Sequence, residues 1–457
     1  MTRSGDQEIE LLGEYLRSFP AIDTHDHLYP AEMLQQQVVT PNGPGMDLCG
    51  LWQTSYFPWT QTLPPRSPAE PFSQWWAQAK SAFPHGRALS VYHHLTRAIH
   101  DLYDVDFGRL DDDEANRLNE QIFGKYQSTT DWVREVVTER ANIELVFIDP
   151  CWHYGELRYY YPFQILVLRI QQFLHGHSSA EFAHDPVVPG KHRISPYDLA
   201  QQWGMQIDDF DDYLDLMDRV VAEGKALGAY TLKQAVAYLR TLHFARVPKD
   251  RAARAFGKPR GELSGAEIQD FEDFIMWRLA ELSAKYDLPF QIHTGPGLLP
   301  HSHPMLLCNL IEANPATRFI LFHGGVPWVS EIGMMAFKFP NVWLDANWMP
   351  ILSQTMARRA FHEWLDMVPS NRIMWGCDSL TPEGMYGAAE ITRDILAQVL
   401  AERVQMGNIG RDDARDIGRQ ILRENALTMF PQLQARLWKH TGKLPPAPPC
   451  AGMVSSR

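Results

Sequence analysis

Short apolar runs recur along the chain, and most are followed by a stretch with helical spacing of apolar positions. The runs that we expect to form strands cover residues 21–27, 143–150, 163–170, 226–232, 288–295, 317–325, 341–347 and 372–379. Many of them are apolar at consecutive positions, as in parallel strands covered on both faces, whereas half-exposed antiparallel strands alternate apolar with polar. The pattern therefore predicts parallel strands inside a shell of helices.

Helical spacing fills the gaps between the later runs. It predicts helices over residues 267–286, 304–315 and 353–368, and two or three closing helices over about 388–430. Strands that alternate with helices in this way are typical of a (β/α)8 TIM barrel, which is the fold class that we predict.

Two gaps are too long to be barrel loops. We interpret about residues 30–140 as a helical cap inserted after the first strand, over the strand ends, and about 171–224 as a second insertion. We therefore expect one barrel domain over residues 1–440, with these insertions, and a flexible tail over 441–457.

Composition narrows the class of partner. The net charge of -13 argues against a nucleic-acid or anionic-membrane surface, which needs clustered Lys and Arg. No stretch approaches the ~18 apolar residues of a membrane span, and the N-terminus lacks the apolar core of a secretion signal. The cysteines are scattered without CxxC spacing, so we expect reduced thiols. These features predict a cytoplasmic protein with a small-molecule substrate, and they leave a homo-oligomer open.

Metal-binding residue types fall at the ends of four predicted strands. His25 and His27 follow the first strand, His293 the fifth, His323 the sixth and Asp378 the eighth. The carboxyl ends of barrel strands converge on one mouth, and residues i and i+2 of a strand face the same side. Imidazole with carboxylate suits Zn²⁺, and also Mn²⁺ or Fe²⁺, and a metal-bound water can act as a nucleophile near neutral pH. The sequence therefore predicts a divalent metal centre.

These residues lie in the motifs "HDH", "IHTG", "FHGG" and "GCDS", which occur in barrel order. Together they resemble the amidohydrolase superfamily of metal-dependent hydrolases, over about residues 20–430. The branch that the chain is most similar to holds uronate isomerase-like proteins, aromatic-acid decarboxylases and the barrel half of proteins fused to glutamine synthetase-like domains.

The resemblance implies roles for individual residues. Asp378 would bind the metal and carry a proton, and His323 would bind a second metal or polarise a substrate carbonyl. Many members carry a carboxylated lysine on the fourth strand that bridges two metals, and Lys233 stands at that place. Lys233 could instead neutralise a substrate carboxylate or begin a solvent-facing helix, so one metal ion or two remain open.

Other residues have competing interpretations. Arg169 and Arg240 are candidates for binding a substrate carboxylate. Asp23 is expected to orient a histidine, and Cys377 to pack in the core. The aromatic stretch at residues 56–60 could line a substrate pocket or pack within the cap, and the pattern does not separate these.

The leading hypothesis is a metal-dependent hydrolase that cleaves an amide, lactone or ester-like bond with a metal-activated water. The first alternative is a decarboxylase or uronate-type isomerase on the same scaffold, because one barrel supports many reactions. The second is a barrel without catalytic activity that serves as a binding module. Loss of one of the metal-binding residues would favour that last alternative, and all five are present.

Overall fold

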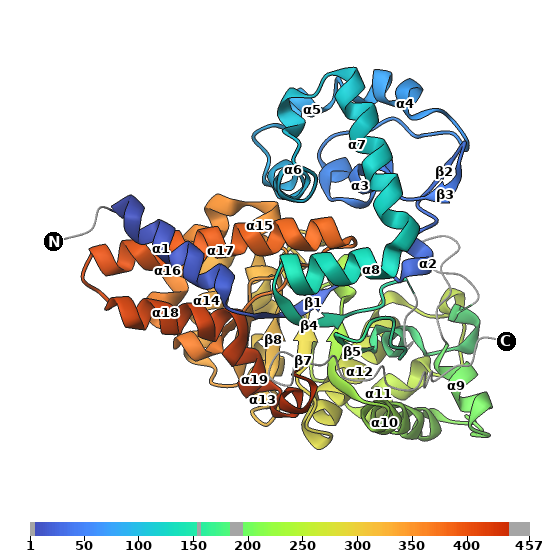
Figure 1. The fold of residues 1–457 in the computed structure, drawn as a ribbon. Coiled ribbons are helices and arrows are strands. Elements are labelled where there is room, and N and C mark those ends of the chain that lie inside the picture. The colour runs from blue at the N-terminus through green and yellow to red at the C-terminus, as the bar shows by residue number, and fades with distance from the viewer. Residues whose placement is uncertain (1–4, 153–156, 183–194, 438–457) are drawn as a thin grey trace.

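A parallel barrel forms the centre of the molecule. The computed structural model describes residues 5–152, 157–182 and 195–437 (Figure 1). Its main sheet has eight strands in the order β1-β4-β5-β6-β7-β8-β9-β10, and every neighbouring pair is parallel. The strands are β1 (Ala21–Asp26), β4 (Ile143–Ile148), β5 (Gln164–Arg169), β6 (Ala229–Gln234), β7 (Phe290–Ile292), β8 (Phe319–Leu321), β9 (Val342–Asp345) and β10 (Ile373–Met374). Each lies within or overlaps a predicted run, so the TIM barrel is confirmed.

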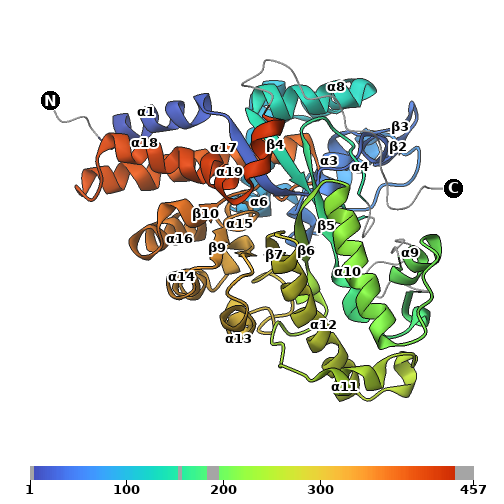
Figure 2. The same ribbon diagram turned by 90° about the horizontal axis from the view of Figure 1, so that it is seen from below.

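Helices surround these strands on the outside (Figure 2). They are α10 (Phe210–Ala226), α11 (Lys249–Ala252), α12 (Gly265–Lys285), α13 (Cys308–Ala313), α14 (Val329–Lys338), α15 (Met349–Leu352) and α16 (Gln354–Met367). The longest, α12, begins where the Ser264 side chain and Glu267 form a capping box, which satisfies backbone N–H groups that would otherwise lack acceptors. The helices predicted over residues 267–286 and 353–368 are confirmed as α12 and α16.

The first and last strands meet at the closing seam of the barrel. Thr24 N–H donates to the Trp375 carbonyl at 3.2 Å, and Asp378 N–H donates to the His25 carbonyl at 3.0 Å. A Cβ atom on Gly376 would lie within 2.9 Å of both the backbone nitrogen and the carbonyl oxygen of His25, so the strands can approach this closely only with glycine at that position.

A large, mainly helical insertion separates β1 from β4. It holds a hairpin of β2 (Val38–Thr40) and β3 (Gly43–Gly45), with α2 (Ala31–Leu34), α3 (Leu48–Thr54), α4 (Phe72–Ala79), α5 (Phe83–Gly86), α6 (Ser90–Tyr103), α7 (Asp112–Lys125) and α8 (Thr129–Arg134). Most of it gathers in a lobe beside the barrel, while α8 lies against the barrel itself (Figure 1). The helical insertion expected after the first strand is therefore present, and we call it the cap.

The segment between β5 and β6 holds α9 (Pro196–Gln202) and then α10, which packs against β6 as a barrel helix. The last part of the predicted second insertion at 171–224 is therefore α10, which belongs to the helical shell of the barrel. Residues 183–194 within it, and the predicted tail at 441–457, lie outside the described residues.

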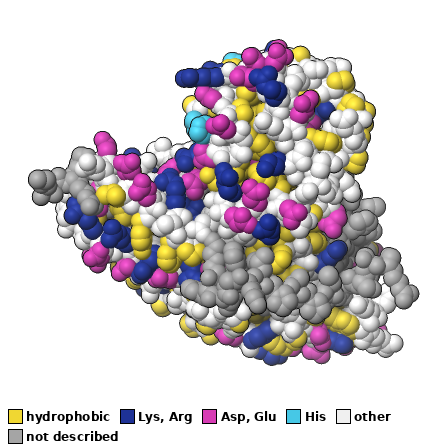
Figure 3. Space-filling model, in the orientation of Figure 1, with side chains coloured by type: hydrophobic (Ala, Val, Ile, Leu, Met, Phe, Trp, Pro, Cys, Tyr) yellow, Lys and Arg dark blue, Asp and Glu magenta, His cyan; other side chains and the backbone are white. Residues whose placement is uncertain are grey.

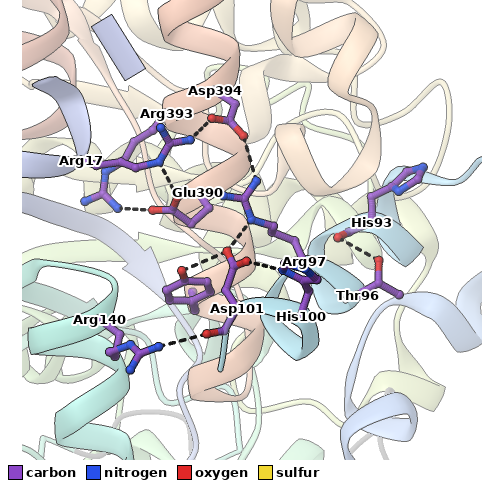
Figure 4. Close-up of polar contacts among 11 residues, drawn as sticks. Arg17, His93, Thr96, Arg97, His100, Asp101, Arg140, Glu390, Arg393 and Asp394 are labelled. Atoms are coloured by element: carbon purple, nitrogen blue, oxygen red, sulfur yellow. Dashed lines mark hydrogen bonds and ion pairs between the residues drawn. The ribbon is translucent and has the colours of Figure 1, made fainter. Parts of the chain in front are cut away.

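The chain closes with three helices, α17 (Pro382–Gln405), α18 (Arg411–Arg419) and α19 (Asn425–Met429), and α1 (Gly5–Ser18) packs on the first two. A network of charged side chains joins α1, α6 and α17 (Figure 4). Arg17 donates to Glu390 at 2.7 Å, Arg97 donates to Asp394 at 3.3 Å, and Arg393 donates to Glu390 at 3.1 Å. Arg97 thus fastens the cap helix α6 to α17, and Arg17 fastens α1 to the same helix.

A buried carboxylate makes a second attachment between the cap and α17. Glu383, in the first turn of α17, is fully buried and accepts three hydrogen bonds from neutral donors of the cap. Tyr103 and Trp132 donate to Oε1 at 2.7 and 2.8 Å, and Tyr126 donates to Oε2 at 2.6 Å. A buried charge is tolerated only with such partners, so the cap and the start of α17 are held as one unit.

Charged side chains of both signs are interspersed over the face seen in Figure 3. Among the described helices, none is long and apolar enough to cross a membrane.

Replacing Glu383 with Ala is expected to lower the free energy of unfolding by at least ~3 kcal/mol, because three buried donors lose their acceptor at about 1–3 kcal/mol each. Glu383→Gln keeps an acceptor and should lose less. Urea denaturation followed by circular dichroism measures both, and Glu10→Ala, at an exposed position, serves as the control with a change within ~0.5 kcal/mol. An unchanged midpoint for Glu383→Ala would contradict the attachment.

Candidate metal centre

The carboxyl ends of the barrel strands enclose one cavity of about 380 Å³. His25 lies in β1 and His27 just after it, His293 follows β7, His323 follows β8, and Asp378 lies in the loop after β10. All five side chains line this cavity. The fold therefore brings to one place the five residues that the sequence pattern singles out.

Three of the five form a group compact enough to hold a single ion. Ligand atoms of His25, His27 and Asp378 all lie within 4.8 Å of one another. Asp378 Oδ1 is 3.6 Å from His27 Nε2, and Asp378 Oδ2 is 3.9 Å from His25 Nε2. Two imidazoles and a carboxylate, with space left for water or substrate, are typical of a catalytic metal site.

The hydrogen bonds of His27 direct one of its nitrogens toward Asp378. His27 Nδ1 lies 2.8 Å from the Asp149 carbonyl oxygen, which can only accept, so Nδ1 carries the hydrogen. Burial lowers the pKa of His27, but Cys151, Asp378 and Asp149 outweigh burial and raise it to about 9. A metal ion that binds His27 would displace a proton from it, which is the usual linkage of metal binding to proton release.

His25 is a neutral imidazole. Burial, reinforced by the charge of Lys233, holds the pKa of His25 well below its usual range. Its Nδ1 is buried without a hydrogen-bond partner in the described part of the chain. The donor set itself, two imidazoles and one carboxylate, fits a divalent metal.

His293 and His323 are hydrogen-bonded to each other next to this group and are not part of it. His293 Nε2 donates to the Pro296 carbonyl, which leaves Nδ1 to accept from His323 Nε2 at 2.7 Å. His323 Nδ1 then presents a lone pair 3.3 Å from Asp378 Oδ2. Two facing lone pairs repel unless a proton or a cation lies between them. Both nitrogens of His293 have hydrogen-bond partners, so His293 is not part of the three-residue group, and its role as a metal ligand stays a prediction.

Unusual backbone conformations concentrate at the cavity. His323, Trp348 and Asp378 have φ angles of 61°, 60° and 56°, in the left-handed region that residues other than glycine rarely adopt. All three residues line the cavity. Such strain persists only where the surrounding structure imposes it, and it is frequent at functional sites.

Lys233 lies in β6 with its side chain in the cavity. Its Nζ is 3.7 Å from the centre of the Phe322 ring and has no hydrogen-bond partner in the described structure. Burial, together with Arg169, lowers the pKa of Lys233 to about 7, against the opposing charge of Asp149. The amine is therefore neutral in part of the population near pH 7, the state in which it could react with CO₂ or receive a substrate proton.

The two arginines predicted to bind a carboxylate lie in different surroundings. Arg169 lines the cavity and donates to Asp149 at 2.7 Å. Arg240 is not among the cavity residues, and its guanidinium is engaged by Glu272 at 2.9 Å and Asp273 at 2.5 Å. Only Arg169 is placed to meet a ligand in this cavity.

A second set of buried carboxylates holds the backbone behind the metal-binding residues. Asp23 Oδ1 accepts from the backbone N–H of His25 at 3.0 Å and of Cys377 at 3.1 Å. Asp26 Oδ2 accepts from Ser379 N–H at 3.1 Å. Asp23 therefore orients His25 through its backbone, and Cys377 is buried in the core, as the pattern predicted.

Aromatic residues form one wall of the cavity; the sequence pattern offered residues 56–60 as one interpretation of it and did not identify Tyr238 or Trp348. Tyr56 and Trp59 come from the cap, Tyr238 follows β6, and Trp348 follows β9. Tyr56 donates to Asp378 Oδ1 at 3.1 Å. Both interpretations of the stretch at residues 56–60 therefore hold: Tyr56 and Trp59 line the cavity, and Phe57 packs inside the cap. The concentration of aromatic residues in this stretch indicated a possible pocket wall, but their spacing could not show which rings face the barrel.

Solved structures share the fold. A uronate isomerase from Thermotoga maritima aligns with a TM-score of 0.71 at 14% identity, covering 94% of this chain and 100% of that one. A glucuronate isomerase from Caulobacter crescentus gives 0.72 at 13% identity, covering 94% and 95%. A protein described as a metal-dependent hydrolase from Lactobacillus casei gives 0.61 at 16% identity, covering 93% and 98%.

Sequence comparison adds a relative and a family. Protein fluG of Emericella nidulans is 33% identical over 148 residues, which cover 31% of this chain and 17% of fluG, so the match spans less than a fifth of that protein. The family model described as amidohydrolase matches residues 204–432, half of the chain. That segment includes the strands that carry His293, His323 and Asp378. The chain belongs to the amidohydrolase family.

Proposed function

We propose that the protein is a metal-dependent hydrolase of a small molecule with an amide, lactone or ester-like bond. The observation that carries this proposal is the group of His25, His27 and Asp378, whose ligand atoms lie within 4.8 Å of one another in the cavity at the strand ends. The donor set favours Zn²⁺, with Mn²⁺ or Fe²⁺ as alternatives. When bound, such an ion polarises a carbonyl and lowers the pKa of water near it.

Asp378 and His323 are the proposed proton carriers. The pKa of Asp378 is raised by burial, against the opposing charges of His27 and Lys233. Its Oδ2 faces His323 Nδ1 at 3.3 Å, so a proton taken from a nucleophile can be held between these two atoms and returned to a leaving group. The His293 ring behind His323 holds that imidazole in one orientation.

Lys233 and Arg169 supply positive charge on the same wall of the cavity. They are paired across neighbouring strands and both are buried. One role is to hold a substrate carboxylate or a developing negative charge. The other is a carboxylated Lys233 that bridges two metal ions, as the family resemblance implies, and the metal content of the protein separates these roles.

The second candidate is an isomerase of a sugar acid. It is favoured by the shared fold with the two uronate isomerases, which extends over 94% of the chain in both cases. A decarboxylase and a binding module without catalysis remain further alternatives on this scaffold. The aromatic wall, with Tyr56, Trp59 and Trp348, adds apolar surface to this cavity, and hydrolysis stays the leading proposal on the strength of the metal-binding group.

A substrate screen separates these reactions. Dipeptide-like amides, lactones, aromatic acids and uronates are incubated with the metal-loaded protein, and CO₂ release is followed separately. Hydrolysis of an amide or lactone without CO₂ supports the proposal, whereas conversion of a uronate or release of CO₂ would replace it with one of the alternatives.

Metal analysis of protein purified without chelators is expected to give about one divalent ion per chain. His27→Ala should reduce this content strongly, because one of three ligands is lost. The control is His362→Ala, which should leave the content unchanged, because the His362 ring bonds to Glu402 at 2.8 Å and lies outside the cavity. A content of about two ions per chain in the wild type, with both ions lost in Lys233→Ala, would favour the carboxylated bridge. Protein free of metal after reloading with Zn²⁺ would contradict the centre.

Asp378→Asn is expected to lower kcat by about 10²–10⁴-fold on a substrate found in the screen, because the amide cannot accept a proton. Steady-state kinetics measures the effect, with circular dichroism to show an intact fold and metal analysis to show whether the ion is retained. Activity near that of the wild type in a metal-loaded, folded variant would remove Asp378 from proton transfer.

A further inference from the structure

Tyr56 is a cap residue that reaches the metal centre. Its hydroxyl donates to Asp378 Oδ1 at 3.1 Å, although the two residues are 322 positions apart. The donor comes from the short loop between α3 and the 3-10 turn at Phe57–Trp59. The acceptor is the same oxygen that faces His27 Nε2 at 3.6 Å. A side chain outside the barrel therefore bonds directly to one of the three metal-binding residues.

The cap holds this tyrosine firmly. The next residue, Phe57, is fully buried, with its ring centre 5.0 Å from that of Trp52 and 5.4 Å from that of Phe83. A Cβ atom on Gly86 would lie 2.4 Å from the Phe57 ring, so there is no spare space at this contact. Displacing Tyr56 would require Phe57 to leave the cap core.

The barrel holds the other side of the Tyr56 ring. Its centre lies 4.7 Å from that of Trp348, which follows β9, and 5.4 Å from that of Trp59 in the cap. Aromatic pairs at these separations are attractive and directional. The ring is thus clamped between cap and barrel, and its hydroxyl has a fixed direction toward Asp378.

The bond to Tyr56 restricts how the Asp378 carboxylate can turn. A carboxylate rotates easily about its terminal torsion, and such rotation would exchange the oxygens that face the histidines. With the phenol bound to Oδ1, Oδ2 stays toward His323 Nδ1 at 3.3 Å, and the remaining lone pair of Oδ1 stays available toward His27. One hydrogen bond therefore fixes both directions in which Asp378 acts.

We propose that Tyr56 is a positioning residue of the metal centre, supplied by the cap, which raises metal affinity by fixing the orientation of Asp378. This inference rests on the proposed metal-dependent function. It gives the cap a part in building the centre as well as in enclosing substrate. Partners that orient metal ligands commonly change metal affinity by about 10–100-fold when they are lost.

The test compares Tyr56→Phe with Tyr29→Phe. Each variant removes one hydroxyl from the same cavity, and Tyr29 makes no hydrogen bond to Asp378 in the described structure. The Kd for Zn²⁺ is measured by competition with a chromophoric chelator, using protein stripped of metal. We expect Tyr56→Phe to weaken Zn²⁺ binding about 10-fold or more, and Tyr29→Phe to stay within about 2-fold of the wild type.

Two further measurements separate positioning from a general structural role. Urea denaturation of the metal-free proteins should give equal midpoints for the wild type and both variants. The visible absorption bands of the Co²⁺-loaded protein report ligand geometry, and they should change only in Tyr56→Phe. Wild-type affinity and an unchanged Co²⁺ spectrum in Tyr56→Phe would overturn the inference while leaving the proposed function intact. Equal weakening in both variants would also overturn it, and a wild-type protein that binds no Zn²⁺ would overturn both.

Discussion

The metal centre depends on the hydrogen bonds that close the barrel between its first and last strands. His25 and Asp378 are separated by most of the chain, and they become neighbours because Asp378 N–H donates to the His25 carbonyl and Thr24 N–H donates to Trp375. The absence of a side chain at Gly376 allows this approach. Every strand between these two must have the twist and tilt that bring the seam together, so the ligand geometry is a property of the whole sheet.

Burial at the seam also determines the charges of the centre. Asp378 and Lys233 are both shielded from water, and burial shifts the pKa of each toward the neutral form, upward for the carboxyl and downward for the amine. His27 is the exception, because nearby anionic groups keep it protonated. Binding of a metal ion at His27 would therefore be coupled to release of a proton.

The barrel and the residues at its strand ends could be predicted from the sequence because both follow from local rules. Parallel strands are recognised by continuous apolar runs, and their carboxyl ends must share one mouth. The pairing of His293 with His323 and Pro296 could not be predicted in this way, because it depends on ring orientations after folding. Arg240 is a second example. Its position along the chain was compatible with substrate binding, but in the folded protein its guanidinium is engaged by Glu272 and Asp273 of α12, which the sequence pattern could not show.

The cap was predictable as an inserted helical segment, but its contribution to the site was not, since no periodicity identifies a single ring that leaves the cap core. The attachments described above have a consequence for how such barrels can change. The cap holds the loop from Asp378 to Glu383 at both ends, through Tyr56 at one end and through the three donors to Glu383 at the other. A cap exchanged with that of another barrel would have to reproduce both attachments, so the cap and this loop are constrained to vary together.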